Sequence, residues 1–498
     1  MKIKHIFMTA VAAMSIVATS CSGFLDRTPY TFPVEEEFWK TADQADAGVV
    51  GTYSLLRNTL GSRSRYNAIG DFAGVDWYQN PGMQDWTYLT KMQFEKNDGT
   101  MATYRNWTQY YQVINQINRA LVHLENNYKD SQFVEEGYAE DYRTQLIGEL
   151  YFLRGFTYYM MYKTWGGVPV VTQVPSSYLG AAYLPRALAS EVAELIYGDL
   201  QDALERLDWE YKSASDKTYR ANKAVVYATI AHMAAWDGDY VKCVNACDSI
   251  INSGMYDLEG SESIKKYTEN VSPELIFQQY YGSKDEATSP LYTGSMSSSD
   301  FYHTFCCTPY WGNSSWGSAT AEPIASFNDV KIKQLFADGD DDLRWFNFFG
   351  TSPGGIVVCH KFNNFDEDAE NSLYCMNNRV IFRLADIYLL RAEGHAALGN
   401  NGAAIDDLNK IRNRSGLKNY DGSTSLFRAI LDERGRELFL EGHRYYDMCR
   451  YYFNTGISLL QNTSAAQMGQ GKYLMPVDPA LFENNIVTLQ NPYWQGRV

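Results

Sequence analysis

Acidic and basic side chains crowd together in ERGRELFLEGHRYYDMCRY, residues 433–451. Glu433, Glu437 and Glu441 follow one another at four-residue steps, which would place them on one stripe of a helix beside arginines. Two chemistries suit such a segment. In the first, Glu441 and Asp447 are the acid and base of a glycoside hydrolase, which needs two carboxyl groups about 5 to 10 Å apart. In the second, which we favour, the charges form ion pairs that hold the segment to its neighbours, and the protein has no catalytic residue.

Metal and phosphate chemistry find little support in the sequence. Cys243 and Cys247 lie one helical turn apart, but core packing explains them better than half a zinc site, because the matching residues of a second copy are Ala404 and Leu408. The Asp-rich run 338–342 lacks the glycine and distal glutamate of an EF-hand, so we favour a solvated turn and keep a structural calcium as the alternative. No phosphate-binding glycine loop occurs, and we expect no cofactor. No metal-ligand spacing is found among His232, His303, His360, His395 and His443.

The N-terminus has the three parts of a secretory signal peptide. Lys2 and Lys4 precede an apolar stretch, residues 6–17, that is too short to span a bilayer as a helix. Small residues then lead to Cys21, and this arrangement resembles the lipobox of bacterial lipoproteins, which implies that residues 1–20 are removed and Cys21 is lipidated. Two or three acyl chains would hold the protein at a membrane, since each buried methylene contributes ~0.8 kcal/mol. The alternative is a plain secretory signal followed by a chance cysteine.

Charge and composition narrow the class of protein. The chain has 498 residues and a formal net charge of −16, which disfavours binding to nucleic acid and to anionic lipid surfaces. After residue 17 no run of 18 apolar residues appears, so we expect no transmembrane helix. Seven further cysteines are scattered through the chain, and their pairing cannot be read from the sequence.

Helical periodicity and an internal repeat predict the scaffold. Apolar residues recur at three- and four-residue steps over 103–125 and 145–162, and a third helix is expected near 187–207. Residues 224–250 align without a gap on residues 385–411. The alignment matches Ala224 with Ala385, Tyr227 with Tyr388, Ala231 with Ala392, Ala235 with Ala396, Gly238 with Gly399, Val244 with Ile405 and Ile250 with Ile411. Each copy predicts two helices around a glycine turn, which resembles a tetratricopeptide repeat.

A different composition separates the two copies. Residues 256–378 are rich in Gly, Ser, Asn and aromatic residues, and neither a helical nor a strand period is evident there. Because large aromatic residues seldom crowd into unfolded linkers, we expect an ordered surface lobe on a helical scaffold.

Several ordered motifs resemble the SusD/RagB family of glycan-binding lipoproteins of Bacteroidetes. The resemblance covers nearly the whole mature chain, and ERGRELFLEGHRYYDMCRY is its most specific motif. One departure is Tyr493, which stands where a glycine commonly follows Asn-Pro in the family. The other motifs are CSGFLDRTP from Cys21, GELYFLRGFTYYMMYKTWGGVPVV from Gly148, FADGDDDLRWF from Phe336, YLLRAEGHAALGNNGAAIDDLNKIRNRSGL from Tyr388 and YLMPVDPALFENNIVTLQNPYW from Tyr473.

The resemblance implies a fold, a function and a partner. We expect a mainly α, tetratricopeptide-like scaffold with a loop-rich ligand-binding lobe, forming one SusD-like domain over residues 21–498. Its expected parts are helices over about 35–255, the lobe over about 256–377, repeat helices over about 378–450 and a Pro-rich tail over 451–498. The implied function is non-catalytic glycan binding on the outside of the outer membrane, with delivery to a SusC-like TonB-dependent transporter. A glycoside hydrolase remains the alternative function. The sequence does not identify the sugar or its linkage.

Two stretches combine aromatic and short polar residues as a sugar site requires. A sugar ring has an apolar C–H face and a rim of hydroxyls, and Trp and Tyr offer a flat apolar body with a polar tip. Because Trp is highly buried on average, we expect about half of the candidate rings to face solvent. The candidates are Asp76, Trp77, Tyr78, Asn80 and Trp86 in the first stretch and Tyr310, Trp311, Asn313 and Trp316 in the second.

Overall fold

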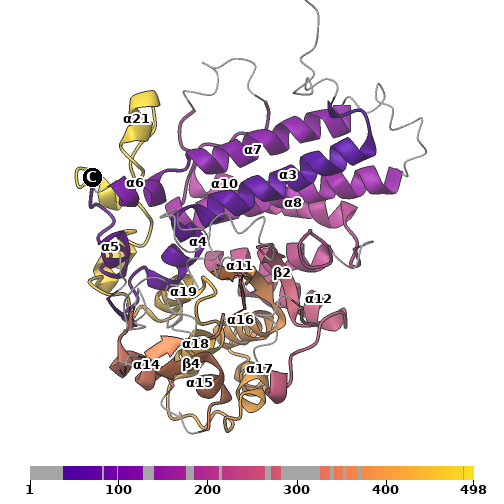
Figure 1. Ribbon diagram of the computed structural model, residues 1–498. Helices are drawn as coiled ribbons and strands as arrows, with labels where there is room; N and C mark the ends of the chain where they lie inside the picture. The colour runs from indigo at the N-terminus through magenta and orange to yellow at the C-terminus, as the bar shows by residue number, and fades with distance from the viewer. Residues whose placement is uncertain are drawn as a thin grey trace, which may run out of the picture.

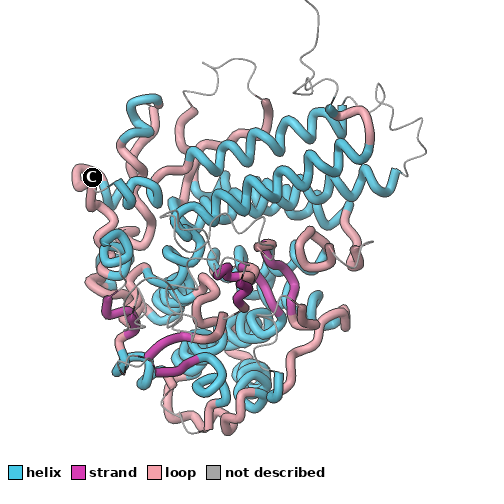
Figure 2. The backbone as a smooth tube through the Cα atoms, in the orientation of Figure 1, coloured by secondary structure: helices cyan, strands magenta, loops and turns pink. Residues whose placement is uncertain are grey.

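Helices dominate the protein, which confirms the expectation of a mainly α fold (Figure 2). Cys21, Tyr310, Trp311, Asn313 and Trp316 lie outside the described residues. The computed structural model describes residues 38–80, 84–97, 99–126, 140–174, 184–211, 216–263, 271–281, 326–336, 341–351, 355, 357–362, 364–367, 373–485 and 487–498.

Four long helices pack into the layer at the top of Figure 1. They are α3 (Ala42–Gly61), α7 (Thr108–Leu121), α8 (Glu140–Trp165) and α10 (Ala189–Arg206). The apolar stripe that predicted α7 is buried, including Val113, Ile114 and Ile117. Inside the layer, a buried ion pair of 2.7 Å between Arg154 and Asp199 joins α8 to α10.

The first predicted helix, 103–125, is divided in the structure. Residues Gly99–Arg105 form α6, and α7 begins at Thr108. The reason is local, because the side chain of Asn106 accepts a hydrogen bond from the backbone N–H of Thr108 at 2.9 Å and so competes with a continuous helical ladder. The helix predicted over 145–162 is α8, which ends just before Gly166 as expected.

Helical hairpins in series form the lower part of the molecule (Figure 1). The two aligned copies are α11 (Lys223–Asp237) with α12 (Tyr240–Asn252) and α16 (Leu384–Ala397) with α17 (Asn401–Arg414). The matched glycines Gly238 and Gly399 have φ values of 78° and 77°, a left-handed backbone that favours glycine at a helix end. The predicted repeat is therefore confirmed, and a third hairpin follows as α18 (Leu426–Glu437) and α19 (Arg444–Thr455).

Short antiparallel strand pairs join these helices. They are β1 (Tyr78–Asn80) with β3 (Ser326–Phe327), β2 (Leu275–Gln279) with β8 (Arg379–Arg383), β4 (Phe349–Thr351) with β5 (Val357–Cys359), and β6 (Phe365–Glu367) with β7 (Leu373–Cys375). Several of these, with α14 (Asp329–Leu335) and α15 (Leu343–Phe348), lie in the region where no period was evident. The elements have only two to seven residues, and β2 is buried at every position, so no alternation marks it.

Smaller helices complete the described fold. No helix in the described ranges combines the length and apolar character that crossing a bilayer requires. These smaller elements are α4 (Arg65–Asn67), α5 (Gln84–Thr90), α20 (Ala465–Gly469), α21 (Ala480–Asn484), the π-helical turns Ala68–Phe72 and Val122–Asn126, and the 3-10 turns Ser62–Ser64, Ser261–Ser263 and Pro492–Trp494.

Candidate functional site

The connection between α18 and α19 is a tight turn built around Gly442. Helix α18 ends at Glu437, so Glu441 lies in the turn and not on the helical stripe that the spacing predicted. Leu440 and Gly442 adopt φ values of 60° and 80° there. The backbone N–H of Gly442 donates to both carboxylate oxygens of Asp71, at 3.1 and 2.9 Å. This contact fixes the turn against the π-helical segment before β1.

A buried ion network surrounds this turn. Arg383 contacts Glu274, Glu437 and Glu441 at 2.5, 2.6 and 2.8 Å. Arg344 contacts Asp342, Glu433 and Glu437 at 2.9, 2.8 and 3.0 Å. All these side chains are at most 1% exposed. The same network includes Lys361, Arg414 and Arg436.

The network holds its carboxylates ionised. Burial alone would raise the pKa of Glu433, but Arg344 and Arg436 outweigh it and lower that pKa to about 2. Burial likewise opposes ionisation of Glu441 and Asp447, and neighbouring cations again lower both pKa values below their usual range. A glycosidase acid needs a raised pKa, so Glu441 and Asp447 do not form the hydrolase pair. The structural interpretation of this motif, as ion pairs between neighbouring segments, agrees with the geometry.

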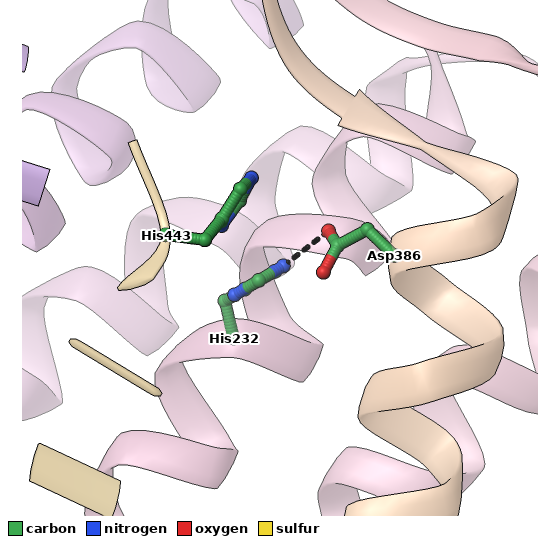
Figure 3. A group of neighbouring side chains, drawn as sticks. All are labelled: His232, Asp386 and His443. Carbon is green, nitrogen blue, oxygen red and sulfur yellow. Dashed lines mark hydrogen bonds and ion pairs between the residues drawn. The ribbon is translucent and has the colours of Figure 1, made fainter. Parts of the chain in front are cut away.

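Two histidines that lie far apart in the sequence meet beside Asp386 in the core (Figure 3). His232 is 2.7 Å from one carboxylate oxygen of Asp386, and Arg434 donates to the other oxygen at 2.9 Å. The rings of His232 and His443 stack with centroids 5.5 Å apart. Sequence spacing missed this group because its members come from α11, α16 and the turn before α19.

The geometry around Asp386 does not fit a metal centre. Arg434 already neutralises Asp386, and Arg450 adds a second positive charge nearby. A divalent cation would add to these two positive charges in a buried site. The group is therefore a buried cluster in which His232 and Arg434 satisfy the Asp386 carboxylate. Burial lowers the pKa of His232 and lowers that of His443 to about 4.

Two other sequence candidates for metal chemistry have structural roles. Cys243 and Cys247 are free and fully buried on α12, as core packing requires. Asp342 caps α15 and holds Arg344 through both carboxylate oxygens, so it is not free for calcium. Asp338 and Asp340 lie outside the described residues.

The aromatic residues of the first candidate stretch pack in the core. Trp77, Tyr78 and Trp86 are 5%, 6% and 0% exposed. The indole N–H of Trp86 donates to the hydroxyl of Tyr104, and Tyr78 packs edge-on against Phe72. A sugar platform needs an open ring face, so the structure corrects the expectation of ligand platforms at these three rings.

Asp76, a polar candidate of the first stretch, is exposed where the rings of that stretch are buried. The side chain of Asp76 is 40% exposed and forms an ion pair of 2.9 Å with Lys331 of α14. Both border a polar pocket of about 230 Å³, where the guanidinium of Arg444 lies 4.4 Å from the Trp77 ring. The other lining residues are Gln334, Leu335, Arg428, Asp432, Met448 and Leu459.

Strand pairing joins the first candidate stretch to the described segment that follows the second stretch in the sequence. Tyr78 of β1 is paired with Phe327 of β3, and Asn80 with Ser326. Asn80 therefore ends the first stretch's strand beside Ser326, the first residue described after the second stretch.

Comparisons with known proteins identify the family. A family model described as the SusD family matches residues 347–494, and one described as starch-binding associating with outer membrane matches residues 24–234. The chain is 25% identical to SusD-like protein P38 of Formosa agariphila over 487 residues, covering 90% of this chain and 92% of that protein. It is 32% identical to starch-binding protein SusD of Bacteroides thetaiotaomicron over 149 residues, 28% of this chain and 24% of that one.

Solved structures show the same fold. A SusD homolog from Bacteroides thetaiotaomicron matches with a TM-score of 0.75 and 23% identity, covering 91% of this chain and 98% of that one. Surface glycan-binding protein A from Bacteroides uniformis matches with a TM-score of 0.71 and 20% identity, covering 91% and 99%. The motif around Glu437, the helical hairpins and the two family models agree, and the chain belongs to the SusD/RagB family.

Proposed function

We propose that the protein is a non-catalytic glycan-binding lipoprotein of the outer cell surface. The observation that carries this proposal is the match of both parts of the chain to SusD-family models, one of them described as starch-binding associating with outer membrane. The structure supports a binder over a hydrolase, because the carboxylates of the strongest motif are already occupied by arginines and Lys361.

The glycan binds at the edge where β1 and β3 meet. The pairing of these strands supports this location, because β1 contains Tyr78 and Asn80 of the first stretch and β3 begins ten residues after Trp316 of the second. Since Trp77, Tyr78 and Trp86 are buried, the stacking platforms are Tyr310, Trp311 and Trp316 of the second stretch. Asp76, Asn80 and Asn313 supply polar partners for sugar hydroxyls.

A glycan array followed by calorimetry tests this binding site. Trp311→Ala and Trp316→Ala should each weaken binding of the identified glycan by ~1–3 kcal/mol, the range for loss of one aromatic stacking partner. Phe453→Ala is the matched control, since it removes a half-exposed ring on α19 outside both stretches and should leave the affinity unchanged. Unchanged affinity in both tryptophan variants would move the glycan site elsewhere.

Absence of hydrolysis is tested with the same glycan. Incubation should release no new reducing ends. Product that disappears in Glu441→Gln would contradict the proposal and restore the hydrolase.

The lipid anchor and the transporter complete the proposed function. Cys21 carries the lipid, and a SusC-like TonB-dependent transporter receives the glycan. Cys21→Ser should release the protein from membranes of cells that lack the transporter, as measured by fractionation. If the variant still pellets with those membranes, Cys21 is not the only attachment.

A further inference from the structure

A second pocket lies beside the C-terminus, near α5 and α6 in Figure 1. Its volume is about 430 Å³, within the range of ~300–1,000 Å³ that small-molecule sites occupy. Three segments far apart in the sequence form it: the connection after α5, the chain around α20 and the C-terminal tail. Its lining residues are Lys91, Met92, Gln93, Glu95, Asn462, Lys472, Tyr493, Trp494 and Arg497.

This tail pocket has more basic than acidic side chains. Three cations face one carboxylate, Glu95, in a protein whose net charge is −16. Among the described residues, no carboxylate forms an ion pair with any of the three cations, Lys91, Lys472 and Arg497. Lys472 is only 8% exposed, and its ammonium group donates to the backbone carbonyl of Asn462 at 2.6 Å. The pocket therefore has positive charge available for an anionic group.

The walls of the tail pocket are held in place. Met92 and Asn462 adopt φ values of 54° and 50°, a left-handed conformation that is uncommon for residues other than glycine and that gathers at functional sites. The side chain of Asn462 donates to the backbone carbonyl of Lys91 at 3.3 Å and links the two segments. On the opposite wall, the indole N–H of Trp494 donates to the carbonyl of Leu474 at 2.6 Å.

We propose that the tail pocket binds one acidic sugar unit, with Lys472 and Arg497 facing its anionic group and Gln93, Glu95 and Asn462 contacting hydroxyls. The mixture of polar groups favours a sugar acid over a bare anion, because Glu95 would repel an ion that brings no hydroxyl donors. The volume suits a single sugar with its bound water. This inference rests on the proposed function only in taking the ligand to be a sugar, and the pocket is distinct from the β1–β3 edge.

Titrations with galacturonic acid and galactose, followed by NMR signals of the ligand, test this proposal. The acid should bind at least ten times more tightly than the neutral sugar. Arg497→Met should weaken galacturonate binding tenfold or more and leave galactose unaffected, and Lys472→Met should act in the same direction. Lys242→Met is the matched control, because Lys242 is exposed and already paired with Asp239. Arg497 is exposed, so its variant stays folded even if the Lys472 variant does not.

Three outcomes would overturn the proposal. They are equal binding of acid and neutral sugar, unchanged acid binding in Arg497→Met, and displacement of galacturonate by sulfate at equal concentration, which would show a simple anion site. Trp311→Ala separates this result from the proposed function, because it should weaken the glycan bound at the β1–β3 edge and leave galacturonate in the tail pocket unaffected.

Discussion

The ion network at the α18–α19 turn and the tail pocket use the same residue types in opposite ways. In the network, Arg383 and Arg344 each contact three carboxylates, so their charges are already paired within the protein. In the tail pocket, neither Lys472 nor Arg497 is in contact with a carboxylate among the described residues, and Glu95 is the one acidic side chain that lines the pocket. A charge that the fold neutralises belongs to the scaffold, whereas one that it leaves available can serve a ligand.

Removing one charge from the network should have the largest effect on stability. Glu437 contacts Arg344, Arg383 and Arg414, all buried. Glu437→Gln keeps the shape but leaves three guanidinium groups short of one negative charge, so we expect a loss of about 3–5 kcal/mol in the free energy of unfolding. Urea denaturation measures it. A loss below about 1 kcal/mol would show that the network does not hold the turn and would remove the contrast with the tail pocket.

Mild acid should weaken the folded protein through the histidine cluster before it reaches the carboxylates. Burial lowers the pKa of His443 to about 4 from an ordinary value of 6.5. Between these values the unfolded chain binds a proton that the folded protein does not. The free energy of unfolding should therefore fall as the pH drops from 6.5 to 4, by about 3 kcal/mol at most for this residue.

A histidine variant distinguishes the loss of stability between pH 6.5 and 4 from the loss at lower pH that is due to the carboxylates. His443→Gln should reduce the loss of stability between pH 6.5 and 4, and the remaining loss in that range comes from His232, whose pKa is also lowered by burial. It should leave the steeper loss below pH 4.5, where Glu433 with its pKa of about 2 begins to lose its stabilising charge. Identical pH profiles for both proteins would show that His443 is not buried in its neutral form.

The sequence predicted local patterns better than contacts between distant segments. The spacing of alanine and glycine was sufficient to predict the helical hairpins of the repeat. Gly238 and Gly399 each end the helix that precedes them, so their role depends on nearby residues alone. Glutamate spacing indicated ion pairing, but it could not name Lys361 or Arg383 as partners.

Two features could not be predicted from the sequence, because both depend on contacts between distant segments: the burial of the tryptophan rings and the meeting of the three segments that form the tail pocket. Trp77 and Trp86 lie in a stretch with the composition of a surface loop, yet they pack in the core. Tyr493 and Trp494 of the tail pocket end the motif that begins at Tyr473, but nothing in that motif indicated that the segments around Lys91 and Asn462 would meet it.

An exposed ion pair should contribute far less to the free energy of unfolding than the buried network does. Arg206 and Asp202 lie one turn apart on α10 at 2.8 Å, with side chains 28% and 42% exposed. Water and salt screen such a pair, so Asp202→Asn should cost about 0.5 kcal/mol or less, and less still at high ionic strength. A loss as large as that of Glu437→Gln would mean that pairing alone, and not burial, sets the contribution of a charge.

The smallest effect on stability should come from the tail pocket itself. Arg497 is exposed and has no described carboxylate partner, and its guanidinium lies 4.4 Å from the Tyr493 ring. Methionine keeps an apolar stem that can cover this ring, so Arg497→Met should change the free energy of unfolding by less than about 0.5 kcal/mol. The same variant should nevertheless lose galacturonate binding, as argued above. A variant that instead unfolds as readily as Glu437→Gln would place Arg497 in the scaffold, because a cation free for a ligand is one that the folded protein does not need.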